Sequence, residues 1–183
     1  GLIFGSLSSS DYEQYEYQSY VSNNIIVDNK VDLNRLYQTV LDNNYNFENK
    51  KDYEQFSDEK IYSFCKIICD NLNDKITDYS INLNDLDYVL SNLKIVGYTG
   101  FVYATINDQI CLIINEKMID SLGKGGLEKI LKHESMHLIQ KTFDKDLIGI
   151  NYRFPDLKVN PLYNKWFLEA SAERISLDIG EKE

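Results

Sequence analysis

The chain has 183 residues, a formal net charge of −10 and 43% hydrophobic residues, so it can bury one sizeable core and should fold rather than stay disordered. So large an acidic excess is repelled by phosphate backbones and anionic lipids, which argues against a nucleic-acid or membrane-surface partner and favours basic ones. No apolar run reaches the roughly 20 residues that a membrane-spanning helix needs.

The spacing of apolar residues predicts two long helices in the first half of the chain, over 31–44 and 57–74, and a shorter helix that begins near residue 84. Ser57 is the expected N-cap of the second helix. Cys65 and Cys69 lie one turn apart in that helix, and we interpret them as core residues rather than metal ligands.

β-Branched and aromatic residues become frequent after residue 93. The segments 93–106 and 109–119 predict two β-runs around a tight turn at Asn107-Asp108. A loop and a helix over 127–143 follow, and the composition of 164–180 predicts a final helix. The predicted fold class is therefore α+β and mostly helical.

We divide the chain into a helical N-terminal region, 1–93, and a catalytic core, 94–183, and expect the two to pack as one compact domain. The sequence does not begin with methionine, which we interpret as a trimmed N-terminus. We expect a soluble protein, and both a cytoplasmic and an exported location stay open.

The two histidines of the chain, His133 and His137, lie in the helix predicted over 127–143 and form the pattern H-E-x-x-H. Residues four apart on an α-helix point in directions about 40° apart and lie about 6 Å apart along the axis, so both imidazoles can bind one tetrahedral ion. Glu134 is about 100° round the helix from His133, where it can act as general base on water held by that ion. The alternative is a solvated histidine pair, which the otherwise apolar helix disfavours.

An acidic pair, Glu169 and Glu173, lies four residues apart in the segment WFLEASAER. One carboxylate can complete a zinc site of two histidines and one glutamate, with the fourth position left for water. The other can accept a hydrogen bond from the distal N–H of a ligand histidine. The alternative is a solvated acidic face, although like charges at this spacing repel slightly and a nearby dication would relieve that repulsion.

These motifs resemble those of the gluzincin metallopeptidases, the thermolysin-like zincins. The resemblance covers about residues 94–178, and the second motif follows His137 by 32 residues (169 − 137). It implies a zincin-like fold, in which a small mixed β-sheet precedes the H-E-x-x-H helix and an edge strand within 98–113 borders the substrate cleft.

The resemblance also implies roles for individual residues. His133, His137 and Glu169 would hold one zinc ion per chain, Glu134 would be the general base, and Glu173 would orient a ligand histidine. Because the family more often has aspartate at the position of Glu173, that longer side chain is an alternative third ligand.

Peptide hydrolysis develops an oxyanion that needs a stabilising group besides the metal. The chain has no third histidine, so the candidates are Tyr152, Arg153, Tyr163 and Arg174. We select Tyr163, and note that Arg174 can instead neutralise the acidic pair.

The sequence therefore predicts zinc-dependent hydrolysis of a peptide bond in a peptide or protein substrate by metal-activated water. Two alternatives stay open: a catalytically inactive zinc-binding interaction module, and an effector or toxin protease that cleaves one protein target. A metzincin is disfavoured because the residues after His137 lack the glycine and third histidine of that group. The net charge of −10 also disfavours a DNA-repair zincin.

Overall fold

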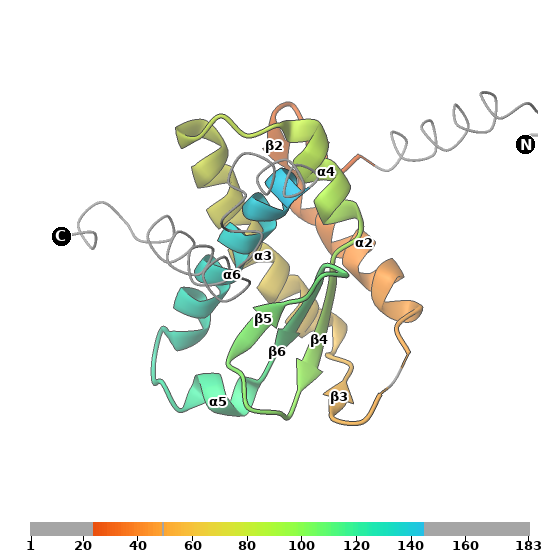
Figure 1. Cartoon of the computed structure of the whole chain (residues 1–183), viewed down its shortest axis with the longest axis vertical. Helices are drawn as coiled ribbons and strands as arrows, with labels where there is room; N and C mark the ends of the chain where they lie inside the picture. The colour runs from red at the N-terminus through yellow and green to blue at the C-terminus, as the bar shows by residue number, and fades with distance from the viewer. Residues whose placement is uncertain (1–23, 49, 145–183) are drawn as a thin grey trace, which may run out of the picture.

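The computed structural model describes residues 24–48 and 50–144. In this part of the chain the elements follow in the order β1 (Ile26–Val27), β2 (Lys30–Val31), α2 (Leu33–Tyr45), β3 (Tyr53–Glu54), α3 (Asp58–Asp78), α4 (Leu83–Ser91), β4 (Lys94–Tyr98), β5 (Ala104–Ile106), β6 (Cys111–Ile114), α5 (Glu116–Asp120) and α6 (Gly126–Asp144) (Figure 1). The fold is α+β, as predicted. None of the helices described is both long and apolar enough to cross a membrane.

The three helices predicted before residue 93 are confirmed as α2, α3 and α4. Each begins directly after a polar residue whose side chain accepts a backbone N–H of the first turn: Asp32, Ser57 and Asn82. The strands β1, β2 and β3 were not predicted, because two-residue strands are too short to show an alternating pattern.

Four strands form a mixed sheet in the order β3-β4-β6-β5. β4 pairs with β6 in parallel, while β3–β4 and β5–β6 are antiparallel. The prediction of one continuous β-run over 93–106 is wrong, because the chain leaves the sheet after Tyr98 and returns as β5 on the far side of β6. The turn at Asn107-Asp108 is confirmed: the Asn107 side chain accepts the backbone N–H groups of Gln109 and Cys111.

The second predicted β-run also ends earlier than expected, at Ile114. Asn115 then caps α5, its side-chain oxygen accepting the Met118 N–H at 3.2 Å and its amide donating to the Gly100 carbonyl at 2.6 Å. This single buried side chain therefore begins a helix and fixes the connection between β4 and β5.

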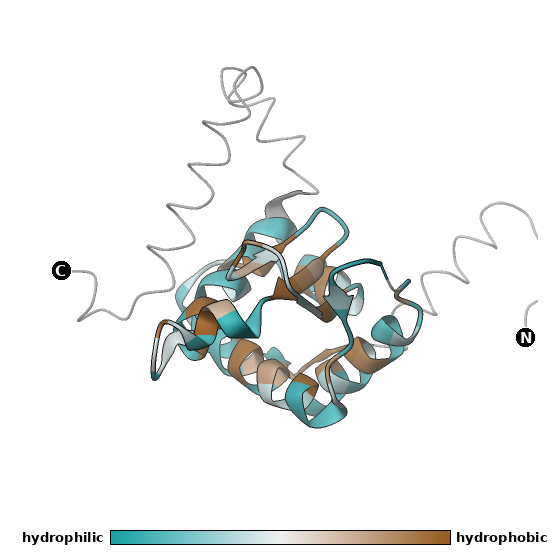
Figure 2. Cartoon of the chain, turned by 90° about the horizontal axis from the view of Figure 1, so that it is seen from below, coloured by the Kyte–Doolittle hydropathy of each residue, from teal (hydrophilic) through white to brown (hydrophobic). Residues whose placement is uncertain are grey.

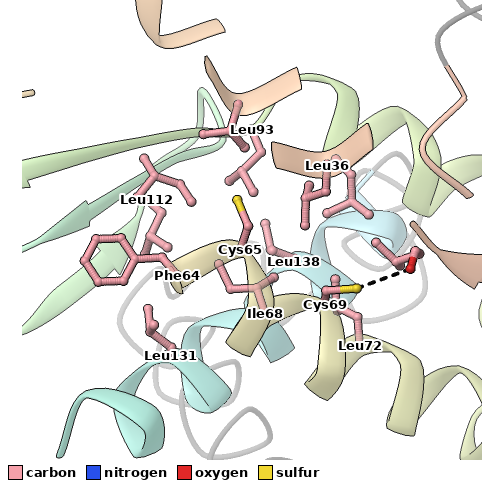
Figure 3. Packing of buried hydrophobic residues seen from close by; sticks show 14 of the residues in the cluster. Leu36, Phe64, Cys65, Ile68, Cys69, Leu72, Leu93, Leu112, Leu131 and Leu138 are labelled. Atoms are coloured by element: carbon pink, nitrogen blue, oxygen red, sulfur yellow. Dashed lines mark hydrogen bonds between the residues drawn. The ribbon is translucent and has the colours of Figure 1, made fainter. Parts of the chain in front are cut away.

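One face of the sheet packs against the helices. Ile95, Leu112 and Ile114 belong to the main core, whereas Val96 and Ile113 face the other side with a small aromatic group. In Figure 2 the central strands are brown and the helices alternate between brown and teal, as amphipathic helices do around a shared core. Figure 3 shows α3 at the centre of this packing, between side chains of α2, α6 and the sheet; the labelled residues include Leu36, Phe64, Ile68, Leu72, Leu112, Leu131 and Leu138.

The three cysteines are buried and free. Burial disfavours the thiolate, and it raises the pKa of Cys65 to about 12 and the pKa values of Cys69 and Cys111 to about 11. The Cys69 thiol donates to the Val31 carbonyl at 3.2 Å (Figure 3). The interpretation of Cys65 and Cys69 as core residues is confirmed, since both thiols are buried in the main hydrophobic core.

A buried asparagine joins α2 to the sheet. The Asn44 amide donates to the Ile95 carbonyl at 2.8 Å, and its oxygen accepts the Ile95 N–H at 3.0 Å. The neighbouring strand β3 pairs only with Gly97 and Tyr98, so Asn44 supplies the hydrogen bonds that the first half of β4 lacks on that side.

We expect Asn44→Ala to lower the free energy of unfolding by about 2–4 kcal/mol, because it leaves two buried backbone groups of Ile95 without partners. Urea titration followed by circular dichroism measures this loss. The control is Asn34→Ala on the same helix, where the side chain is exposed, and we expect a change within about 0.5 kcal/mol. Equal stability of the two variants would contradict the role given to Asn44.

Candidate metal centre

Helix α6, which carries both histidines, packs against α3, α4, α5 and β5. The Asn71 amide of α3 donates to the Ser135 hydroxyl at 3.0 Å and to the Lys132 carbonyl at 3.3 Å. Ser135, Met136 and Leu138 are buried on the inner side of the helix. These contacts hold the inner side of α6 against the rest of the protein near the two histidines. The two imidazoles lie on the other side of the helix and are half-buried.

The structure brings His133 and His137 together, as the spacing predicts. Their Nε2 atoms lie 3.2 Å apart, and both rings are half-buried. Two imidazole nitrogens that bind one tetrahedral zinc ion at about 2.0–2.1 Å would be about 3.3–3.4 Å apart. The pair therefore fits an ion of that size and geometry with little rearrangement.

A neighbouring glutamine is placed to hold His137 in one tautomer. His137 Nδ1 lies 2.8 Å from Gln140 Oε1, and because a carbonyl oxygen only accepts, Nδ1 is the donor. Nε2 then presents its lone pair toward His133, which is the tautomer needed to bind a metal through Nε2. We did not predict Gln140 from the sequence, although its place three residues after His137 puts it on the same helix face.

Glu134 completes a compact cluster with the two histidines. One carboxylate oxygen and one nitrogen of each imidazole all lie within 4.8 Å of one another. Glu134 is only 6% exposed, so its charge acts in a medium of low polarity, where electrostatic interactions are strong. A separation of this size can be bridged by one water molecule, so the carboxylate can act on water next to an ion held by the histidines.

The cluster opens onto a cleft of about 740 Å³ between α6 and the sheet. β5, an edge strand among the strands described, forms one wall with the residues just before it, and the α5–α6 loop forms another. The lining residues are Val102, Tyr103, Ala104, Leu122, Lys124, Gly125, Gly126, Lys129, Ile130, His133 and Glu134. This volume is within the range of sites that bind a small molecule or a few residues of a peptide.

The other predicted site residues lie outside the described part of the chain. These are the two glutamates of the second motif and the candidate oxyanion groups: Tyr152, Arg153, Tyr163, Glu169, Glu173 and Arg174. Their roles stay predictions.

The described structure defines an α+β protein in which a His-Glu-His cluster on one helix can hold a metal ion. No family model matches the chain, and neither a curated protein nor a solved structure matches it.

Proposed function

We propose that this protein is a zinc-dependent peptidase of the gluzincin type, with a zincin-like fold, which hydrolyses a peptide bond by attack of water. The observation that carries the proposal is the 3.2 Å approach of the two Nε2 atoms, with the Glu134 carboxylate in the same cluster. Zinc is the ion that best suits two imidazoles, one carboxylate and a water molecule in tetrahedral geometry. His133 and His137 would hold it, with Glu169 as third ligand.

When bound, zinc supplies a Lewis acid and lowers the pKa of a coordinated water to about 7. Glu134 accepts the proton from the attacking water and passes it to the leaving amine, which is the work of a general base that becomes a general acid. Gln140 keeps His137 in the tautomer that binds through Nε2. Tyr163 would stabilise the oxyanion, Glu173 would orient a ligand histidine and Arg174 would offset the acidic pair.

The position of β5 supports a polypeptide substrate. It is an edge strand among those described, and it lines the cleft that contains His133 and Glu134. An extended peptide can add to such an edge through main-chain hydrogen bonds, which hold it without regard to most of its side chains. The scissile bond would then lie next to Glu134.

The proposal is tested by incubating the zinc-loaded full chain with a complex mixture of peptides in water enriched in heavy oxygen. Hydrolysis by water predicts new carboxyl termini that carry the heavy isotope, which mass spectrometry detects. A folded, zinc-loaded chain that creates no new termini, either in this mixture or in intact cellular proteins, would favour a zinc-binding module without turnover.

We expect Gln140→Ala to weaken zinc binding by about 10- to 100-fold, because the His137 ring loses the acceptor that fixes its tautomer and orientation. Gln140→Glu keeps an acceptor at this place and should retain the affinity of the native chain. A competition titration with a chromophoric zinc chelator measures both.

The control for this experiment is Gln38→Ala on α2, where an exposed glutamine bonds only to Asp42 in the described structure. Its zinc affinity should equal that of the native chain. If Gln140→Ala also binds zinc as tightly as the native chain, the hydrogen bond to His137 has no part in holding the ion.

A further inference from the structure

In the described lining of the cleft beside the histidines, positive side chains outnumber negative ones, in contrast to the chain as a whole. Lys124 and Lys129 line the cleft, and both are exposed. Glu134 is the one acidic residue in the described lining, whereas the whole chain has a net charge of −10. The net charge of the chain favours basic partners. The lysines of the cleft instead favour an acidic group at the place where a substrate would bind.

Lys124 and Lys129 are the source of the positive charge in the described cleft lining. Lys124 and Lys129 outnumber Glu134 in the described lining, and a bound zinc ion would add further positive charge. Within the described structure neither of them forms an ion pair, whereas Lys132, close by on α6, lies 3.6 Å from Glu128. Distant acidic groups matter less, because the Debye length is about 8 Å at physiological ionic strength.

The position of Lys129 on α6 indicates how far from the cleaved peptide bond an acidic substrate residue would bind. Lys129 precedes His133 by four residues on α6, which is about 6 Å along the helix axis. An extended peptide advances about 3.3 Å per residue, so this distance corresponds to about two substrate residues. Lys124 lies in the loop that leads into α6 and lines the same cleft.

We propose that this cleft binds an acidic side chain of the substrate, aspartate or glutamate, about two residues from the cleaved bond, through Lys124 and Lys129. The reference to a cleaved bond rests on the proposed function, whereas the acidic preference rests on the cleft itself. Tyr103 and Leu122, which are 41% and 47% exposed at the cleft, offer apolar contacts to the neighbouring substrate residues.

The test measures binding separately from turnover. The zinc-loaded full chain with Glu134→Gln is mixed with equal amounts of two pools of random peptides, which have glutamate or lysine fixed at the central position. Mass spectrometry quantifies the bound peptides of each pool. We expect the glutamate pool to be enriched about fivefold or more, as two partly exposed ion pairs would give.

Charge reversal identifies the residues responsible. Lys124→Glu combined with Lys129→Glu should invert the preference toward the lysine pool. The control combines Lys51→Glu with Lys117→Glu, two exposed sites outside the cleft lining, which changes the net charge equally. We expect the control to keep the preference for glutamate.

Several results would overturn the proposal: equal binding of the two pools, no binding of either pool, or the same inversion in the control. An acidic preference in a chain that cleaves no peptide would leave this site in place and refute the peptidase function. Cleavage of peptides by the native chain without an acidic preference would support the peptidase function and refute this acidic binding site.

Discussion

Replacement of Glu134 by glutamine is expected to leave zinc binding intact and to lower kcat by about 10²–10⁴-fold, the usual contribution of a general base. Glutamine has nearly the same shape as glutamate but cannot take a proton from water. Glu134 is 6% exposed and its carboxylate lies in the cluster with both imidazoles. The described cleft lining contains no second acidic group that could replace it. Peptide turnover by the zinc-loaded variant measures the effect.

The matched control is Glu128→Gln, on the same helix but with an exposed side chain next to Lys132. It should retain the turnover of the native chain. A Glu134→Gln variant with native turnover would exclude Glu134 as the base, and one that has lost its zinc would show that the carboxylate is a ligand instead.

The second large effect is expected at the histidines. We expect His133→Ala and His137→Ala each to weaken zinc binding by at least about 100-fold, since the total binding free energy of a zinc site, about 10–16 kcal/mol, is shared by three or four ligands. Both side chains are half-buried and lie on one face of α6, and alanine is the best helix former. The variants should therefore fold normally, and a chelator competition titration measures their affinity.

Lys117→Ala on α5 serves as the control, because its side chain is exposed and outside the cleft lining. Circular dichroism of all variants separates the loss of zinc from the loss of structure. Unchanged zinc affinity in either folded histidine variant would show that this residue is not a ligand.

The helices could be predicted from the sequence because their signals are local. Ser57, for example, accepts the Lys60 N–H as an N-cap should, and α3 begins at the next residue. The strand pairing could not be predicted, because the parallel pairing of β4 with β6 depends on contacts between distant residues. The β1–β2 hairpin did have a signal that we missed: Asp28 and Asn29 have φ values of 53° and 62°, typical of the tight turns that favour these residue types.

The candidate site, like the fold, has parts that could be predicted from the sequence and parts that could not. The positions of His133, Glu134 and His137 follow from helix geometry alone, so the sequence was enough to place them together. The residue pattern alone does not predict the cleft, because one wall comes from β5 and the other from α6, which meet only through tertiary packing. An edge strand bordering a cleft was expected only from the resemblance to the gluzincins. The support that Asn71 gives to α6 depends in turn on how α3 packs against it.

We propose above that His133 and His137 hold one zinc ion through their Nε2 atoms. A crystal structure of the zinc-loaded full chain, with data collected at the zinc absorption edge, tests this most directly. We expect one anomalous peak about 2.0–2.1 Å from both nitrogens, with a carboxylate of Glu169 or Glu173 as third ligand. A peak elsewhere, or a folded chain that takes up no zinc, would contradict the proposed metal centre and the peptidase function with it.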